Sequence, residues 1–366
     1  MSKILFTPGP GNTSLRVRAA MGCDIGTRTP QMIELTQNVR QQIATVANCG
    51  DDFCVVPLQG SGTFAVEAML TTLLPGVGTC LILSNGPYGE RMATICQIYG
   101  LSHYLLRSDP LAPINMDVVA EFITEHHDIT SVAMVHFETG VGLLNPLPAL
   151  LTLAARRGLQ VFTDSMSAFG LLPVDFTSPA LTAVAASSNK ILHGPPGIAF
   201  VIARRNMLAQ PAAPRTLSLD LRAQFNGFQR DGMWRFTPPV QVIAALACAI
   251  DEYNQQGGRV GRLQRYRQMA ACIVSGLAAY QVMPLIAIDH DAPVISTFVL
   301  PFSEAVLNAH SLSERLLAQD LVIYPSQMTE VNSFRIGFIG ELRPEDGQRL
   351  VAAITGAIQE VRDDAQ

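Results

Sequence analysis

The sequence predicts an α/β fold built around a mostly parallel sheet of seven strands, and two observations support this. From about residue 50 to residue 205, short apolar and β-branched runs alternate with amphipathic stretches of helical length, which is the pattern of βαβ units. A polar or glycine-rich turn follows each apolar run. Open α/β sheets bind their ligands at such turns, at the carboxyl ends of the strands, so we expect a functional site there.

The elements can be assigned in order along the chain. Seven apolar runs are predicted strands: 54–58, 80–84, 103–107, 131–137, 159–164, 181–187 and 198–203. Helical segments fit between them, among them 64–74, 116–126 and 147–157. Past Pro239 the pattern changes to two long helical segments, 240–256 and 262–280. The rest reads as strand, helix, strand, strand and helix, at 294–301, 311–320, 321–325, 333–340 and 347–361. We therefore expect two domains, 1–258 and a smaller α+β domain at 259–366.

Composition excludes several classes of protein. With 48% hydrophobic and 15% charged residues, the chain can bury a large core. Lys and Arg total 25 against 30 Asp and Glu, without a basic run, so no nucleic-acid surface is expected. The apolar stretches are too short for a signal peptide or a membrane span. Seven cysteines without a CxxC pair argue against a disulfide framework and a zinc site. We expect a cytoplasmic protein that binds small molecules and no metal.

The turn Gly60-Ser61-Gly62-Thr63 lies between a predicted strand and a predicted helix. Free amides and the positive end of the helix dipole make such a turn suitable for a phosphate. The spacing to Ala65 also fits a dinucleotide fingerprint, but that needs an acid about 20 residues further on, and the segment 81–89 has none. This disfavours a nicotinamide-dependent dehydrogenase. The hydroxyl groups suit a phosphate monoester, and a purely structural turn is the alternative.

Asp164 and Lys190 each follow a predicted strand, 26 residues apart. A carboxylate leaving a buried sheet needs a cationic partner, unless it caps the next helix. A lysine at the same edge can have a lowered pKa and act as a nucleophile, although a lone lysine can equally be a solvated surface residue. A phosphate turn, a buried acid and a lysine on one sheet edge are what pyridoxal 5'-phosphate requires.

With these residues in place, the chain resembles the fold-type I, class V aminotransferases. The segments that carry the resemblance extend along most of the sequence: 6–10, 58–68, 84–92, 133–146, 163–170, 187–200, 215–221, 233–239, 322–325 and 334–341. Three of them, SNGPYGERM (84–92), RTLSLDL (215–221) and MWRFTPP (233–239), are most similar to the 2-aminoethylphosphonate:pyruvate aminotransferases. The resemblance implies a transaminase that moves an amino group from 2-aminoethylphosphonate to pyruvate, giving phosphonoacetaldehyde and alanine.

The resemblance also implies how the cofactor phosphate is held. Ser61, Gly62 and Thr63 would bind it from one subunit. Thr237 would reach the same phosphate from a partner subunit. A shared active site of this kind implies a homodimer with a two-fold axis.

Five residues would contact the rest of the cofactor on the same basis. Tyr88 would stack on the ring, unless it is an ordinary tyrosine packed on the core. Thr139 would form a hydrogen bond near the ring oxygen, and Met166 would pack on the ring face. Asp164 would pair with the ring nitrogen. Lys190 would attach covalently to the cofactor aldehyde and also carry the proton.

Two arginines are candidates for binding the substrate. Arg335 lies in an otherwise apolar strand, where an arginine is rarely unpaired, so it would bind the anionic end of the substrate or form a structural salt bridge. Arg28 would be a second anion contact or a surface cation. Two segments depart from the phosphonate enzymes. Gly140-Val141 after Thr139 would remove hydroxyl groups beside the cofactor, and GCDIGTRTPQM at 22–32 is more similar to the alanine:glyoxylate enzymes.

These departures keep other activities open. Alanine:glyoxylate or serine:pyruvate transamination is the main alternative. A binding protein that kept the fold without catalysis is a further one. Cysteine desulfuration is excluded, because it needs a cysteine in the C-terminal part and every cysteine precedes residue 273.

Overall fold

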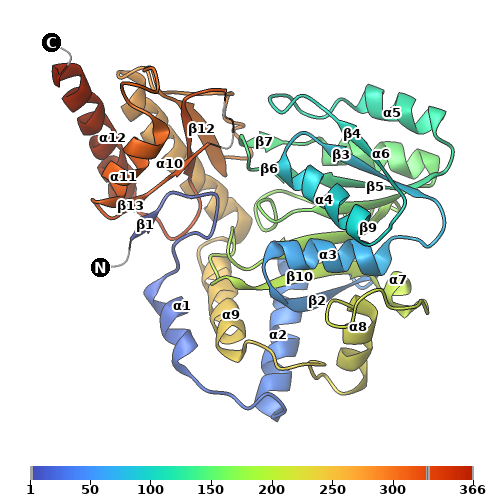
Figure 1. The fold of residues 1–366 in the computed structure, drawn as a ribbon. Helices are drawn as coiled ribbons and strands as arrows, with labels where there is room; N and C mark the ends of the chain where they lie inside the picture. Colours follow the sequence, from blue (N-terminus) through green and yellow to red (C-terminus); the bar gives the residue numbers. More distant parts are fainter. Residues whose placement is uncertain (1–2, 327, 329, 365–366) are drawn as a thin grey trace.

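A sheet of seven strands forms the centre of the larger part of the computed structural model, which describes residues 3–326, 328 and 330–364 (Figure 1). The strand order is β2-β10-β9-β8-β5-β3-β4. All strands are parallel except β10, which is antiparallel to both neighbours. The bounds are β2 Phe53–Gly60, β3 Thr79–Ser84, β4 His103–Arg107, β5 Ile129–Val135, β8 Gln160–Asp164, β9 Leu181–Ser187 and β10 Gly197–Arg204. The predicted α/β class and the seven predicted strands are confirmed, although 131–137 is not continuous: β5 ends at Val135, and Phe137 lies in β6 Phe137–Glu138, which belongs to a separate sheet.

Helices cover both faces of this sheet, because alternate residues of each central strand point to opposite faces. In β10, Phe200 packs into the core on one face and Val201 into the core on the other. One face is covered by α3 and α4, and the other by α2, α6 and α9. The helices of this part are α1 Leu15–Ala19, α2 Pro30–Ala47, α3 Gly62–Leu73, α4 Pro87–Ile98, α5 Met116–Glu125, α6 Leu147–Arg157, α7 Arg205–Ala209, α8 Leu221–Arg230 and α9 Val240–Gln255.

A second, antiparallel sheet of four strands lies in the C-terminal part, in the order β11-β12-β15-β14. Its strands are β11 Met283–Pro284, β12 Ile295–Val299, β14 Tyr324–Pro325 and β15 Ser333–Gly337, with helices α10 Gly258–Ala278, α11 Ala309–Leu317 and α12 Pro344–Asp364. Helix α10 begins at the predicted domain boundary, and the division into domains there stays a prediction.

One predicted strand, 321–325, is wrong as a continuous element. It is divided into β13 Leu321–Val322 and β14. The chain changes partner between them, because β13 pairs with the N-terminal strand β1 Ile4–Leu5, whereas β14 pairs with β15. The N-terminal segment therefore lies against the C-terminal part of the chain (Figure 1).

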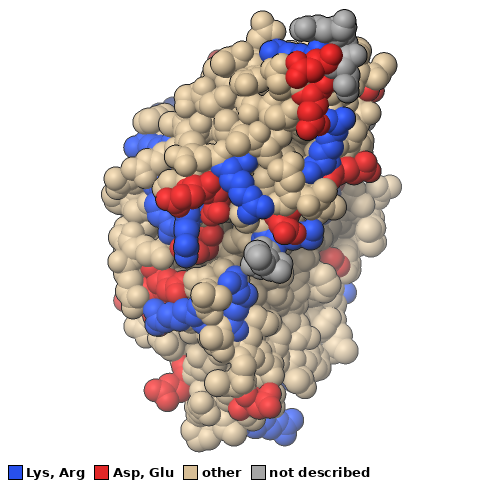
Figure 2. Space-filling model, turned by 90° about the vertical axis from the view of Figure 1, so that its left-hand side faces the viewer, with Lys and Arg blue, Asp and Glu red and all other residues tan. Residues whose placement is uncertain are grey.

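The remaining short elements are the helical turn η1 Ala20–Gly22 and the hairpin of β6 Phe137–Glu138 with β7 Leu143–Leu144. None of the helices in the described ranges has both the length and the apolar character needed to cross a bilayer. Figure 2 shows acidic and basic side chains interspersed over one face of the molecule, without an extended basic patch on that face.

Candidate active site

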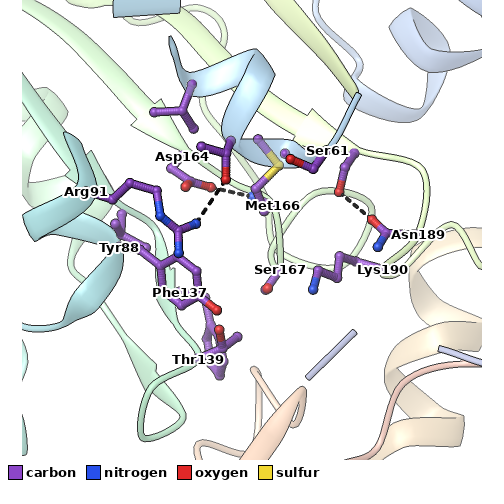
Figure 3. Close-up of a pocket in the computed structure, with 15 residues that line it drawn as sticks. Ser61, Tyr88, Arg91, Phe137, Thr139, Asp164, Met166, Ser167, Asn189 and Lys190 are labelled. Atoms are coloured by element: carbon purple, nitrogen blue, oxygen red, sulfur yellow. Dashed lines mark hydrogen bonds between the residues drawn. The ribbon is translucent and has the colours of Figure 1, made fainter. Parts of the chain in front are cut away.

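Eight of the nine predicted cofactor residues meet at one cavity of about 210 Å³ at the carboxyl edge of the large sheet. Figure 3 labels six of them around this cavity, among them Tyr88, Asp164 and Lys190. Eight predicted residues line it: Ser61, Gly62, Thr63, Tyr88, Thr139, Asp164, Met166 and Lys190. Parallel strands bring them together, since β8 ends at Asp164 and β9 ends three residues before Lys190.

The turn after β2 forms one wall of the cavity. Ser61 is the N-cap residue of α3, but its side chain makes no capping hydrogen bond. The hydroxyl and the amides of the first helical turn are thus available to an anion. Gly62 packs closely against Met166, because a Cβ at this position would lie 2.6 Å from Sδ of Met166 and would displace that side chain.

Asp164 is buried at the end of β8, and burial raises the pKa of its carboxyl to about 6. The positive charges of Arg91 and Lys190 and a hydrogen bond from the backbone oppose this rise. Its Oδ1 accepts that bond from the amide of Met166 at 2.9 Å. Asp164 therefore has the cationic environment that the sequence predicts. It does not cap a helix, because turns and not a helix follow β8, and its bond to Met166 is local to the first of these turns.

The amine of Lys190 is enclosed although the side chain as a whole is only partly buried. Burial of the amine lowers its pKa to about 8; Asp164 opposes this change and Arg335 adds to it. Nζ donates a hydrogen bond to the carbonyl of Pro8 at 2.8 Å. The neighbouring Gly9 has φ +130°, and a Cβ there would lie 2.0 Å from Nζ. The N-terminal segment thus packs directly on the amine.

Arg335 is buried in β15, with 6% of its surface exposed. Nη1 donates to the carbonyl of Thr139 at 3.4 Å, and Nε has no hydrogen-bond partner. Within the described part of the chain, no carboxylate lies within 4.0 Å of its guanidinium. The structural salt bridge considered for Arg335 is therefore not found there. A buried cation without an acid is costly, so the site favours an anionic ligand.

Two predicted site residues lie elsewhere in this chain. Thr237 is exposed in the segment between α8 and α9, and Arg28 is exposed in the segment before α2. Neither lines the cavity. The role of Thr237 depends on a partner subunit, so both assignments stay predictions.

Among the residues that the sequence did not single out, two near the cavity are charged. Arg91 lines it, and its Nη1 donates to Oγ1 of Thr63 at 3.1 Å. Glu138 is buried beside it, and burial raises the pKa of this carboxyl to about 7. Both lie inside segments that carried the family resemblance, 84–92 and 133–146, but their types alone did not separate them from surface or structural residues.

The fold and this site define an α/β protein with an uncapped, glycine-rich turn and an enclosed lysine amine at one edge of its sheet. Residues 13–319 match the aminotransferase class-V family, and the chain belongs to this family. It is 38% identical over 359 residues to a 2-aminoethylphosphonate–pyruvate transaminase of Pseudomonas putida, with 98% of this chain and 97% of the relative covered. A relative named 2-aminoethylphosphonate–pyruvate transaminase 2, from Polaromonas sp., is 36% identical, with 98% and 96% covered.

Solved structures agree in fold. Ureidoglycine–glyoxylate aminotransferase from Bacillus subtilis superposes with a TM-score of 0.89 at 20% identity, covering 99% of this chain and 94% of that one. Pyridoxamine–pyruvate aminotransferase from Mesorhizobium loti gives a TM-score of 0.88 at 23% identity, covering 99% and 93%. The protein is an aminotransferase and its cofactor is pyridoxal 5'-phosphate, as predicted.

The residues present fit this cofactor. The uncapped turn at Ser61 offers donors to a phosphate, and Gly62 leaves space that a Cβ would fill. The buried carboxylate of Asp164 suits a protonated ring nitrogen. The enclosed amine of Lys190 suits an aldehyde.

Proposed function

We propose that this enzyme transfers the amino group of 2-aminoethylphosphonate to pyruvate, giving phosphonoacetaldehyde and alanine. The observation that carries the proposal is the 38% identity, over nearly the whole chain, to transaminases that bear these substrates in their names. The buried and unpaired Arg335 supports it, because both substrates are anions. Membership of the aminotransferase family also removes the nicotinamide-dependent dehydrogenase as an alternative.

The proposed cofactor contacts follow the cavity wall. Ser61, Gly62 and Thr63 would hold the phosphate. Tyr88 and Met166 would enclose the ring and Thr139 would form a hydrogen bond at its edge, where they line the same cavity. When bound, pyridoxal 5'-phosphate supplies an electron sink for the substrate carbon that loses its proton.

Asp164 and Lys190 would carry the proton chemistry. Asp164 would keep a proton on the ring nitrogen through its carboxylate. The Lys190 amine has a pKa of about 8, so near neutral pH a substantial fraction is unprotonated and can accept a proton from the substrate carbon that bears nitrogen. The same amine, once protonated, can donate that proton again. The Pro8 carbonyl, 2.8 Å from Nζ, would hold the amine in position between these steps.

Arg335 would bind the anionic group of each substrate in turn. Its Nη1 donates to the carbonyl of Thr139, a residue that lines the cavity, and none of the described carboxylates lies within 4.0 Å of its guanidinium. A planar guanidinium can bind a carboxylate or a phosphonate through two parallel hydrogen bonds. One residue can therefore serve both half-reactions.

We also infer a homodimer in which Thr237 completes the phosphate site of the partner subunit. Large apolar side chains are exposed beside the relevant segments, Phe64 next to the phosphate turn and Phe236 next to Thr237, with exposed fractions of 46% and 47%. Burying such side chains stabilises an association. The seven cysteines are all free, which supports a reducing compartment such as the cytoplasm.

The half-reaction with single amines tests the proposed substrates. The holoenzyme is mixed with 2-aminoethylphosphonate, alanine, serine or glutamate, and the absorbance of the bound cofactor is followed. We expect 2-aminoethylphosphonate and alanine to convert it, because alanine is the product amine. Conversion by alanine and serine without any response to 2-aminoethylphosphonate would instead identify the glyoxylate-type alternative, to which the segment 22–32 is more similar.

A further inference from the structure

Arg91 lies on α4; the residue as a whole is exposed to solvent, but it lines the cavity, where it contacts Tyr88 and the phosphate turn (Figure 3). Its Cζ is 4.9 Å from the centroid of the Tyr88 ring. Its Nη1 donates to Oγ1 of Thr63 at 3.1 Å. We infer that Arg91 binds the phosphate group of the cofactor and supplies the positive charge that the turn itself lacks.

The contact with Thr63 sets the direction of that hydroxyl. A threonine hydroxyl has one proton to donate and two lone pairs to accept. Because Arg91 donates to Oγ1, the hydroxyl proton remains free to donate to an anion. The arginine and the hydroxyl then act on the same ligand from neighbouring positions.

The charge of the ligand gives the second argument. A phosphate monoester carries between one and two negative charges at neutral pH. The turn offers only amides and hydroxyls, and the cations that line the cavity in the described ranges are Arg91 and Lys190. Lys190 is held by the Pro8 carbonyl and is committed to the aldehyde end. Arg91 is the cation that remains for the phosphate.

Arg91 also lacks the ion pair that would explain it as a structural residue. Its near neighbour Arg107 pairs with Glu90 at 2.9 Å. By contrast, no carboxylate among the described residues is within 4.0 Å of the Arg91 guanidinium. The charge of Arg91 acts to lower the pKa of Asp164, but the carboxylate of Asp164 accepts its hydrogen bond from the amide of Met166.

The phosphonate of the proposed substrate is the other anion that could bind Arg91, because its charge and its oxygen atoms resemble those of the cofactor phosphate. The bond to Thr63 favours the cofactor, since Thr63 belongs to the phosphate turn, whereas Arg335 lies at the Thr139 side of the site. The inference rests on the proposed cofactor contacts and is independent of which amine the enzyme uses.

The test compares two ligands that differ only in the phosphate. Dissociation constants of the full-length protein are measured for pyridoxal 5'-phosphate and for unphosphorylated pyridoxal, in the native protein and in Arg91→Gln, Arg91→Lys and Arg107→Gln. We expect Arg91→Gln to raise the dissociation constant of pyridoxal 5'-phosphate by about 10- to 100-fold, as for a lost charge-assisted hydrogen bond. The dissociation constant of pyridoxal should rise by less than about 3-fold. Arg91→Lys should retain part of the preference, and Arg107→Gln should retain all of it.

Three results would overturn the assignment. If Arg91→Gln weakens the binding of both ligands equally, Arg91 contacts the ring or stabilises the fold. If the binding of both is unchanged, Arg91 is a solvated side chain. Unchanged cofactor binding with a raised KM for 2-aminoethylphosphonate alone would assign Arg91 to the substrate. Arg91→Lys provides the same comparison if Arg91→Gln does not fold. No amine is present in the binding measurement, so its outcome does not depend on the proposed substrates.

Discussion

The lowered pKa of Lys190 can be measured directly, because Lys3 and Lys190 are the two lysines of the whole sequence. The pKa of the Lys190 amine is about 8 rather than 10.5, chiefly through burial. At pH 7.5 a pKa of about 8 leaves about a quarter of the amines neutral, against about one in a thousand at 10.5. The reactive neutral form is thus about 200-fold more abundant than in an ordinary lysine.

Two substitutions should move this pKa in opposite directions. Asp164→Asn removes the negative charge that raises the pKa of Lys190, so the pKa should fall further. Arg335→Met removes a positive charge that lowers it, so the pKa should rise. A general loosening of the site would expose the amine and raise the pKa in both variants, which separates the electrostatic explanation from a structural one.

Competitive acetylation of the full-length protein, stripped of cofactor, provides the assay. Trace acetic anhydride is added between pH 6 and 11, and the labelling of Lys190 relative to Lys3 is read by mass spectrometry. The midpoint for Lys190 should lie near pH 8 in the native protein. A midpoint near 10.5, or the same direction of shift in both variants, would refute the reasoning.

Three further predictions concern the same region and the core beside it. Gly9 has φ +130°, and Gly9→Ala would place a Cβ 2.0 Å from Nζ of Lys190. We expect the substitution to displace the lysine and to leave at least about 10-fold less cofactor that borohydride can reduce onto the protein. The control Gly76→Ala, which has open space around it, should have no such effect. Arg335→Met should raise the KM for both anionic substrates by about 10- to 100-fold, and steady-state kinetics with each substrate varied in turn would contradict this if only one KM changed. Burial lowers the pKa of His136 to about 4, so the unfolded state binds more protons than the folded state between pH 6.5 and 4. The free energy of unfolding therefore falls by about 3 kcal/mol as the pH is lowered from 6.5 to 4. In His136→Asn, whose amide can keep the bond to Ser165, the free energy of unfolding measured with urea should fall less over this pH range than in the native protein.

The sequence was sufficient to predict the large sheet and the position of the site. Hydrophobic runs such as 181–187 lie in strands whose residues are all buried, so their pattern is set by burial alone. Parallel strands end at one edge, and this is why Asp164 and Lys190 could be placed together without coordinates.

Contacts between distant segments were not predictable in the same way. Strand β1 has two residues and pairs with β13, more than 300 positions away, and two residues are too few to show a periodicity. The Pro8 carbonyl that holds Lys190 is a backbone group, so no side-chain pattern marks it. Arg91 resembles any arginine on an exposed helix until its bond to Thr63 is seen.

The departure at Gly140-Val141 illustrates how a sequence difference changes meaning in the structure. The resemblance predicts a loss of hydroxyl groups beside the cofactor, yet of the stretch 139–141 only Thr139 lines the cavity. The amide of Gly140 donates to Oε1 of the buried Glu138 at 2.8 Å, and a Cβ there would lie 3.1 Å from that oxygen. Val141 is itself buried. The two residues therefore accommodate the Glu138 carboxyl within the core, and they bear on its packing more directly than on the choice of amine substrate.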